Sequence, residues 1–187
     1  MTTDEELMLD VRRGDREAFE RLFDRYRDPM WRFFRRRVPD AARAEELAQD
    51  AFVAVLQGAA RYEPRAPLRS YLFGIAYNLL LAERRKSSHQ LVEPLDAEPA
   101  AVSAGDPEAE MSVRSALALL DADDREILML REYEQLSYQE IAHLKKMPLN
   151  TVRSRLFRAR MALKAVLERP VHVPVRVTPM KVTNDGR

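Results

Sequence analysis

Residues 140–163 read EIAHLKKMPLNTVRSRLFRARMAL, and they contain two consecutive helix patterns separated by a proline. A capping-box pair, Ser137 and Glu140, predicts where the first of the two helices begins. The second helix has an apolar stripe with a repeat of four and three residues, which at 100° per residue falls within a sector of about 80°. The stripe consists of Val152, Leu156, Ala159, Leu163 and Val166. This stretch therefore predicts a helix-turn-helix unit whose second helix packs along one face.

The second helix of this unit is strongly basic. Residues 145–169 hold eight Lys or Arg side chains and a single acid, Glu168, although the net charge of the whole chain is only +1. Such local segregation of charge favours contact with phosphate. Phe157 lies among the arginines, opposite the stripe, where it gains nothing in water but could contact a thymine methyl group. We interpret the helix as one that reads DNA; the alternative is a solvated face with one stray aromatic residue.

Helix patterns also fill the amino-terminal part of the chain. Thr3 and Glu6 form another capping box, and Gly14 interrupts that helix before a second apolar series begins. Pro29 is typical of a helix start, which predicts that a separate helix runs through the aromatic residues after it.

Two further helices are predicted before residue 87. Asp40 is the expected amino-terminal cap of one of them, and Gly58 its expected end. A loop follows over residues 61–67, because two prolines within four residues oppose a continued helix. Residues 68–86 then read as a helix with a basic last turn.

The middle of the chain differs in composition from both ends. Residues 88–110 contain six acids and no Lys or Arg, together with three prolines and few large apolar groups, which predicts a flexible acidic linker. Helical spacing resumes over residues 111–169, where Asp123 and Glu126 form the expected cap pair of a helix. Residues 170–187 suggest an extended or disordered tail. The fold class is therefore all-α: two small helical domains, residues 1–87 and 111–169, joined by the linker.

Several function classes are excluded by what the sequence lacks. There is no cysteine, which excludes disulfides and thiolate metal sites and fits a reducing cytoplasm. The start, MTTDEELMLD, lacks the features of a signal peptide, and no apolar stretch is long enough to span a bilayer. The histidines, His89, His143 and His172, have no metal-ligand spacing, and no nucleophile motif or phosphate loop is present. We expect a soluble cytoplasmic protein that is not an enzyme and needs no cofactor.

Residues 140–163 closely resemble region 4.2 of the extracytoplasmic-function (ECF) group of bacterial sigma factors, in which the segment TVRSRLFRAR is a specific signature. Residues 4–87 resemble region 2 of the same group through GDREAFERLFDRY, AEELAQDAFVAVL and LRSYLFGIAYNLLLAERRK. The resemblance covers about 150 of the 187 residues. It implies a subunit that binds core RNA polymerase and directs it to promoters.

The resemblance also implies which residues meet promoter DNA. The second domain would hold the minus-35 element as duplex, and the first would melt and capture the minus-10 element. The implied minus-35 contacts are Lys145, Lys146, Asn150, Thr151, Arg153, Ser154, Arg155, Phe157 and Arg158. The implied minus-10 contacts are Arg61, Tyr62, Arg65, Ser70, Asn78, Arg84 and Arg85. Tyr62 and the nearby arginines would supply aromatic stacking and charge to a flipped base; the alternative is that Tyr62 packs under the loop as core.

Protein partners are implied in the same way. The expected contacts are with the β′ clamp helices and the β flap of core polymerase, and an anti-sigma factor is expected to hold the protein inactive until a signal arrives. No stable homo-oligomer is expected. The implied polymerase-binding residues are Glu45, Glu46, Leu47, Gln49, Asp50, Phe52 and Val53.

Three positions depart from the family pattern: Tyr71 replaces the usual tryptophan, Ala82 a usual acid, and the helix-turn-helix bend has no glycine. A free-standing helix-turn-helix regulator is the main alternative function. Nothing in the sequence resembles a dimerisation helix or a ligand pocket, and the motifs of the first domain would then be unexplained.

Overall fold

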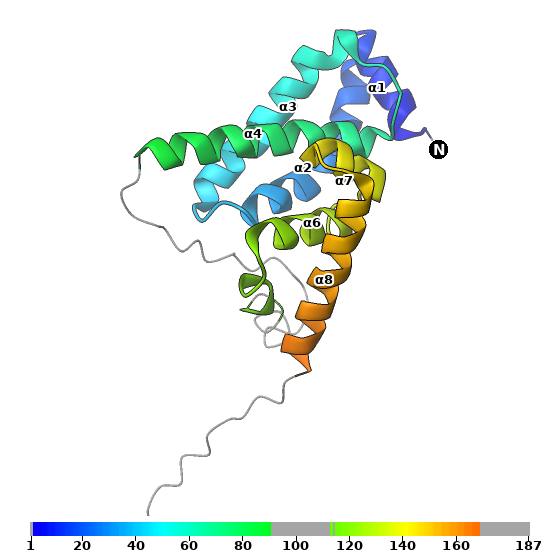
Figure 1. Cartoon of the computed structure of the whole chain (residues 1–187). Helices are drawn as coiled ribbons and strands as arrows, with labels where there is room; N and C mark the ends of the chain where they lie inside the picture. The colour runs from blue at the N-terminus through cyan, green and yellow to red at the C-terminus, as the bar shows by residue number, and fades with distance from the viewer. Residues whose placement is uncertain (1, 91–112, 114, 169–187) are drawn as a thin grey trace, which may run out of the picture.

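The computed structural model describes residues 2–90, 113 and 115–168, and within those ranges all regular secondary structure is helical (Figure 1). The predicted linker, residues 88–110, falls outside the described residues from 91 onward, and the predicted tail lies wholly outside them. The all-α prediction is confirmed. We refer below to residues 2–90 as the first half and to residues 115–168 as the second half.

The first half is a bundle built around the long helix α2. Its elements are α1 (Asp4–Arg12), α2 (Arg16–Arg35), α3 (Ala41–Gly58), the short 3-10 helix η1 (Ala59–Arg61) and α4 (Leu68–Gln90). Met30 and Phe33 of α2, Ala51 of α3 and Leu72 of α4 are fully buried in the core. An ion pair between Arg43 of α3 and Glu83 of α4, with a separation of 2.6 Å, further ties these two helices together. Helices α2, α3 and α4 therefore share one core.

The second half packs a long helix against two shorter ones. Its elements are α6 (Ala122–Glu132), α7 (Tyr138–Lys145) and α8 (Leu149–Leu167), and residues 115–118 are helical as well. The predicted stripe of α8 is buried at Val152, Leu156 and Ala159, which pack with α6 and α7, whereas Leu163 and Val166 are half-buried. The stripe therefore anchors the amino-terminal part of α8 against α6 and α7, and the opposite face of this helix stays exposed.

Local sequence signals place most helix ends correctly. Both capping boxes form: the side chain of Thr3 accepts from the backbone of Glu6, and Ser137 and Glu140 pair in the same way. Asp40 caps α3. In the bend between α7 and α8, Lys146 has a φ of 52°, the left-handed conformation that glycine usually supplies. The missing glycine is thus replaced by a lysine in the same backbone conformation.

Two predicted boundaries were wrong. Pro29 does not begin a helix but lies inside α2, because residues on both sides of it, such as Tyr26 and Met30, are buried on one continuous face that offsets the lost hydrogen bond. The cap of α6 is Asp121, whose carboxylate accepts from the backbone of Asp123 and Asp124, instead of the predicted Asp123. Residues 121–124 read DADD, so the sequence offers three aspartates that could cap the amino terminus of α6, and the pattern alone does not select Asp121.

The two halves lie against each other, with α7 beside α4 (Figure 1). Buried residues of both halves join in a continuous apolar cluster, in which Tyr77 and Leu80 of α4 and Ile127 of α6 take part. Charged side chains surround this junction. The arrangement brings residues about ninety positions apart in the chain into direct contact.

Candidate nucleic-acid interface

The free face of α8 presents the residues that the sequence predicts for duplex DNA. Phe157 is 65% exposed, and Arg153, Ser154 and Arg158 are exposed beside it. The buried side chains of Val152 and Leu156 hold the opposite side of the helix in place. The exposed side chains of Phe157 and its neighbours therefore project from a fixed support. An exposed phenylalanine flanked by exposed arginines can contact bases and phosphates together.

The remaining predicted residues at the start of α8 lie close by. Asn150 is exposed and accepts a 3.4 Å hydrogen bond from Arg153, and Thr151 is half-buried. Lys146 is exposed at the bend. Asn150 and Thr151 therefore lie in the first turn of α8, and Lys146 lies in the bend before it.

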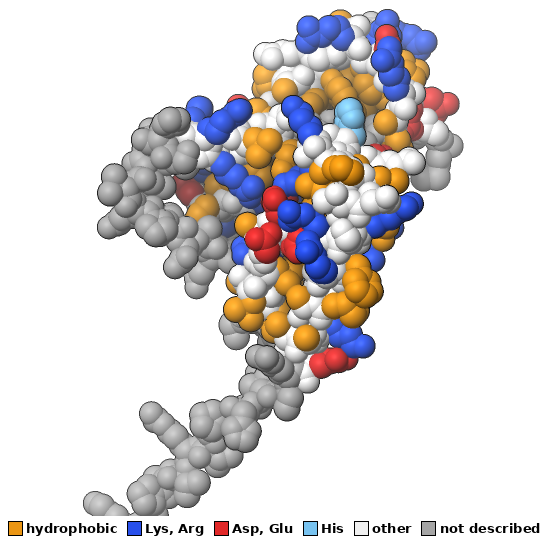
Figure 2. Space-filling view, viewed as in Figure 1, with side chains coloured by type: hydrophobic (Ala, Val, Ile, Leu, Met, Phe, Trp, Pro, Cys, Tyr) orange, Lys and Arg blue, Asp and Glu red, His pale blue; other side chains and the backbone are white. Residues whose placement is uncertain are grey.

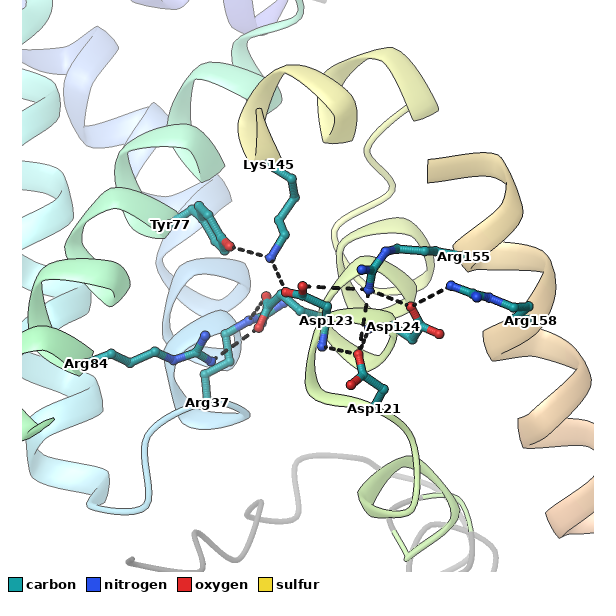
Figure 3. A network of polar contacts seen from close by, with 10 residues as sticks. Arg37, Tyr77, Arg84, Asp121, Asp123, Asp124, Lys145, Arg155 and Arg158 are labelled. Carbon is teal, nitrogen blue, oxygen red and sulfur yellow. Dashed lines mark hydrogen bonds and ion pairs between the residues drawn. The ribbon is translucent and has the colours of Figure 1, made fainter. Parts of the chain in front are cut away.

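Some of these cations are already paired within the second half. The guanidinium of Arg155 lies 2.9 Å from the carboxylate of Asp124 and 3.6 Å from those of Asp121 and Asp123 (Figure 3). Arg158 lies 3.8 Å from Asp124. Arg155 therefore fixes α8 against the amino terminus of α6, whereas Arg158 keeps most of its side chain in solvent.

Lys145 points away from this face and toward the first half. Its ammonium group donates to the hydroxyl of Tyr77 on α4 at 3.0 Å and to Asp123 at 2.9 Å (Figure 3). Burial alone would lower the pKa of Lys145, but these two hydrogen bonds hold the pKa above its ordinary value. In this arrangement Lys145 is not free to meet a phosphate.

The loop predicted to capture a flipped base is only partly accessible. Arg61 and Arg65 are exposed. Tyr62 is 3% exposed; its ring packs edge-to-face against Tyr71 with the centroids 5.2 Å apart, and burial raises the pKa of its phenol. This burial agrees with the alternative in which Tyr62 supports the loop as core, so base stacking on Tyr62 would require the loop to move.

Helix α4 carries the other predicted minus-10 residues along its outer side. Asn78, Arg84 and Arg85 are exposed and Ser70 is half-buried. Arg84 pairs with Glu126 of the second half at 3.3 Å, and the hydroxyl of Ser70 donates a hydrogen bond to Glu140. Two of these four residues are thus in contact with acids of α6 and α7.

The predicted polymerase-binding residues all lie on α3 but are divided between its faces. Leu47 and Phe52 are buried in the bundle. The others are exposed: Glu45, Glu46, Gln49, Asp50 and Val53.

An apolar surface extends from these residues onto α2. Val53 is 50% exposed, Leu56 47% and Phe23 37%, and the Phe23 ring lies 4.7 Å from that of Phe52 between centroids. Exposed apolar groups next to acids are typical of a surface that binds another protein. Phe23 was not predicted from the sequence, although its place in the apolar series of α2 is a visible signal.

The ion pairs between the halves were not predicted from the sequence. The side chain of Arg37 is 1% exposed, and its guanidinium donates to Glu126 and to Glu134 at 2.8 Å each. On the surface, basic and acidic side chains also lie side by side at the middle of the face drawn in Figure 2, whereas the side chains of Arg37, Glu126 and Glu134 are buried. The run Arg35–Arg37 is a signal that cations gather here, but nothing local identifies their partners.

In the part of the chain that the structure describes, no helix is long and apolar enough to cross a membrane. The same residues form no cluster of three or more His, Cys, Asp or Glu side chains suited to a metal ion.

Comparison with known families agrees with this geometry. Residues 22–90 match the family model for sigma-70 region 2, and residues 110–163 match that for sigma-70 region 4. The RNA polymerase sigma-H factor of Pseudomonas aeruginosa is 33% identical over 182 residues, covering 88% of this chain and 94% of that protein. The ECF RNA polymerase sigma-E factor of Escherichia coli K12 is 31% identical over 177 residues, covering 86% and 92%. The chain therefore belongs to the sigma-70 family, in its group of ECF sigma factors.

Solved structures show the same fold. The sigma factor RpoE of Bartonella quintana, in complex with the anti-sigma factor NepR, is similar with a TM-score of 0.64 and 25% identity, covering 82% of this chain and 98% of that one. CnrH in complex with the cytosolic domain of CnrY also gives a TM-score of 0.64, at 24% identity, over 88% of this chain and 96% of that one.

Proposed function

We propose that this protein binds core RNA polymerase in the cytoplasm and directs it to a set of promoters, with residues 1–87 acting on the minus-10 element and residues 111–169 on the minus-35 element. The family assignment supports the role in initiation, and sigma factors are not enzymes. The observation that carries the DNA assignment is the exposed face of α8, where Phe157 projects between Arg153 and Arg158 from a helix held by a buried stripe.

The first half would contribute two surfaces. The exposed acids and Val53 of α3, with Leu56 and Phe23 beside them, are suited to a partner surface that is apolar with a basic rim, and we assign them to the β′ clamp helices. The outer side of α4, with Asn78, Arg84 and Arg85, is suited to the separated strands, because exposed cations follow a phosphate backbone without reading its sequence.

An anti-sigma factor is the proposed regulator. The similar sigma factor RpoE of Bartonella quintana was solved in complex with the anti-sigma factor NepR. The anti-sigma factor would cover the α3 surface or the exposed face of α8. The first is assigned to polymerase binding and the second to binding of the minus-35 element, so covering either one would block initiation.

The test of this function is a comparison of promoter binding with and without core polymerase. DNase footprinting of a responsive promoter should show protection of both elements only when the protein and core polymerase are present together. Tight protection of duplex DNA by the protein alone would instead support a free-standing helix-turn-helix regulator.

A further inference from the structure

A loop of five exposed residues leads from η1 to α4, and the residue on each side of it is buried. Tyr62 before the loop is 3% exposed and Leu68 after it is 0% exposed, whereas residues 63–67 are all exposed. Pro64 and Pro67 restrict the backbone here, because the proline ring fixes φ. We call residues 63–67 the capture loop, since we assign this segment to the flipped minus-10 base. With its middle free of the core, the loop depends on its two ends for its position.

Both ends of the capture loop are tied to side chains of α1, which lies beside this segment (Figure 1). Arg12, in the last turn of α1, donates from Nη1 to the backbone oxygen of Tyr62 at 3.1 Å. Glu5, in the first turn, accepts at Oε1 from the backbone nitrogen of Leu68 at 2.9 Å. Leu68 is the first residue of α4, and an N–H group at this position has no partner within its own helix. A carboxylate of α1 therefore satisfies the start of α4.

The spacing of the two ties is set by the helix that carries them. Glu5 and Arg12 are seven residues apart, which is about two turns, so they project from the same side of α1, about 10 Å apart along its axis. Helix α1 is itself held in place, because Leu7 is 0% exposed and the carboxylate of Asp4 accepts from the hydroxyl of Tyr26 on α2 at 2.5 Å. The two ends of the capture loop are therefore tied to a supported helix.

Two aromatic rings support the start of the capture loop. The ring of Tyr62 packs edge-to-face against Tyr71, and the hydroxyl of Tyr62 has no hydrogen-bond partner among the described residues. Gly58 leaves room for this pair, because a Cβ atom there would lie 2.5 Å from the hydroxyl oxygen of Tyr71. The side chain of Tyr62 is thus held by apolar packing, and the tie to α1 acts on its backbone through Arg12.

We propose that Glu5 and Arg12 are positioning residues for the capture loop, and that they hold its two ends in the arrangement that accepts the flipped base. This role rests on the proposed function, because only a protein that opens promoters has a base to capture. Extruding a base from the stack costs free energy, and a loop that is already in place does not add the cost of ordering its backbone. The two ties therefore favour promoter opening and leave the closed complex unchanged.

The sign of the effect at Glu5 separates positioning from a direct electrostatic role. Glu5 is an acid, so its removal takes away a charge that repels DNA and by itself would strengthen binding. Positioning predicts the reverse: Glu5→Ala should lower the equilibrium constant for opening about tenfold, which is the contribution of one hydrogen bond to a charged group. Glu5→Gln should restore most of the loss, because its amide oxygen can still accept from Leu68.

Arg12 has a matched control one residue away. Arg12→Ala should lower opening by a similar factor of about ten, because it removes the tie to Tyr62. Arg13→Ala removes the same charge, but its exposed side chain pairs with Asp10 and does not tie the loop, so it should leave opening unchanged. Arg12 is exposed, so Arg12→Ala also provides the test if circular dichroism shows that Glu5→Ala loses helical structure.

The first experiment uses holoenzyme reconstituted from core polymerase and each variant on a responsive promoter. Permanganate reactivity of unpaired thymines measures opening, and DNase footprinting at low temperature measures the closed complex. Glu168→Ala is the control for Glu5→Ala, because it removes one acid from an exposed pair with Lys164 at the end of α8. We expect lower permanganate reactivity for Glu5→Ala and Arg12→Ala with unchanged footprints. Parental reactivity in both variants, or an equal loss in Glu5→Gln and Glu5→Ala, would overturn the proposal.

A second experiment asks whether the ties act through the captured base, which a merely structural role would not do. Holoenzyme binds forked DNA in which each base of the single-stranded minus-10 segment is replaced in turn by an abasic site. The parent should lose about tenfold in affinity at the captured position, the contribution of one stacked base. Glu5→Ala should lose little more at that position, because its contact with the base is already impaired. Equal losses in the parent and in Glu5→Ala at every position would refute the positioning role.

The tie itself is measured on the free protein. Amide hydrogen exchange followed by NMR should show that Leu68 is protected in the parent and in Glu5→Gln and exchanges about tenfold faster in Glu5→Ala. Rapid exchange of this amide in the parent would show that Glu5 does not hold the loop, and the proposal would fail. If the holoenzyme opens no promoter, the proposed function fails and the positioning role with it, while the exchange of Leu68 still decides whether the tie exists.

Discussion

Replacement of Phe157 by alanine isolates the contribution of the one large apolar side chain on the exposed face of α8. The ring is 65% exposed. A phenylalanine side chain offers about 200 Å² of surface, so about 130 Å² is available for contact with DNA. If a duplex covers about half of that area, the loss at about 25 cal/mol per Å² is about 1.5 kcal/mol, or about tenfold in affinity.

The assay is promoter binding by the holoenzyme reconstituted with each variant, on a promoter found by transcription of genomic fragments. Leu167→Ala is the matched control, because Leu167 is an apolar residue, 43% exposed, and is the last residue of the same helix. Phe157→Ala should weaken binding about tenfold without lowering the melting temperature, since the ring has few contacts to lose in the free protein. Equal affinities for Phe157→Ala and the parent protein would refute the assignment of this face to DNA and support the solvated-face alternative.

Three further perturbations test other parts of the structure. Val53→Asp, at a position 50% exposed on α3, should weaken binding to core polymerase about tenfold and leave the unfolding free energy unchanged; unchanged affinity in a binding titration would remove Val53 from the polymerase surface. Leu156→Ala should lower the unfolding free energy by about 2 to 5 kcal/mol in chemical denaturation, because the side chain is 1% exposed, and a loss below about 1 kcal/mol would contradict its place in the core. Burial disfavours the charged form of Glu126, but Arg37 and Arg84 outweigh it and hold the pKa of this carboxyl below its ordinary value. The stabilisation that Glu126 contributes is therefore complete above the ordinary carboxyl pKa of about 4.3 and is lost as the pH falls through the lowered value. Chemical denaturation of the parent protein and of Glu126→Gln should accordingly show a difference in unfolding free energy that is constant from about pH 7 to 5 and shrinks only below about 4, and shrinkage already between 7 and 5 would exclude Glu126 as the titrating group.

Features decided by neighbouring residues could be predicted from the sequence. The capping boxes at Thr3 and Ser137 depend on a side chain and a backbone group three residues apart, so the pattern contains the whole interaction. The stripe of α8 was predictable for the same reason, because helical periodicity alone places Val152 and Leu156 on one side.

Features decided by packing could not be predicted in this way. Pro29 reads locally as a helix start, and only the buried residues before and after it show why α2 continues. Tyr62 is an aromatic residue of the kind that stacks on bases, but it lies in the loop after η1 and its ring packs against Tyr71, which is nine positions away on α4. Arg37 and Glu134 are separated by 97 residues, and no spacing rule joins them. The candidate DNA face of α8 was therefore visible in the sequence, whereas the ion pairs between the two halves were not.

Multi-round transcription tests the central claim most directly. Purified core polymerase is incubated with genomic promoter fragments, with and without this protein. Discrete transcripts that require the protein, and that share sequence elements about 10 and 35 positions upstream of their starts, are the predicted result. No protein-dependent transcripts from an active core polymerase, together with tight duplex binding by the protein alone, would contradict the assignment as a promoter-directing subunit.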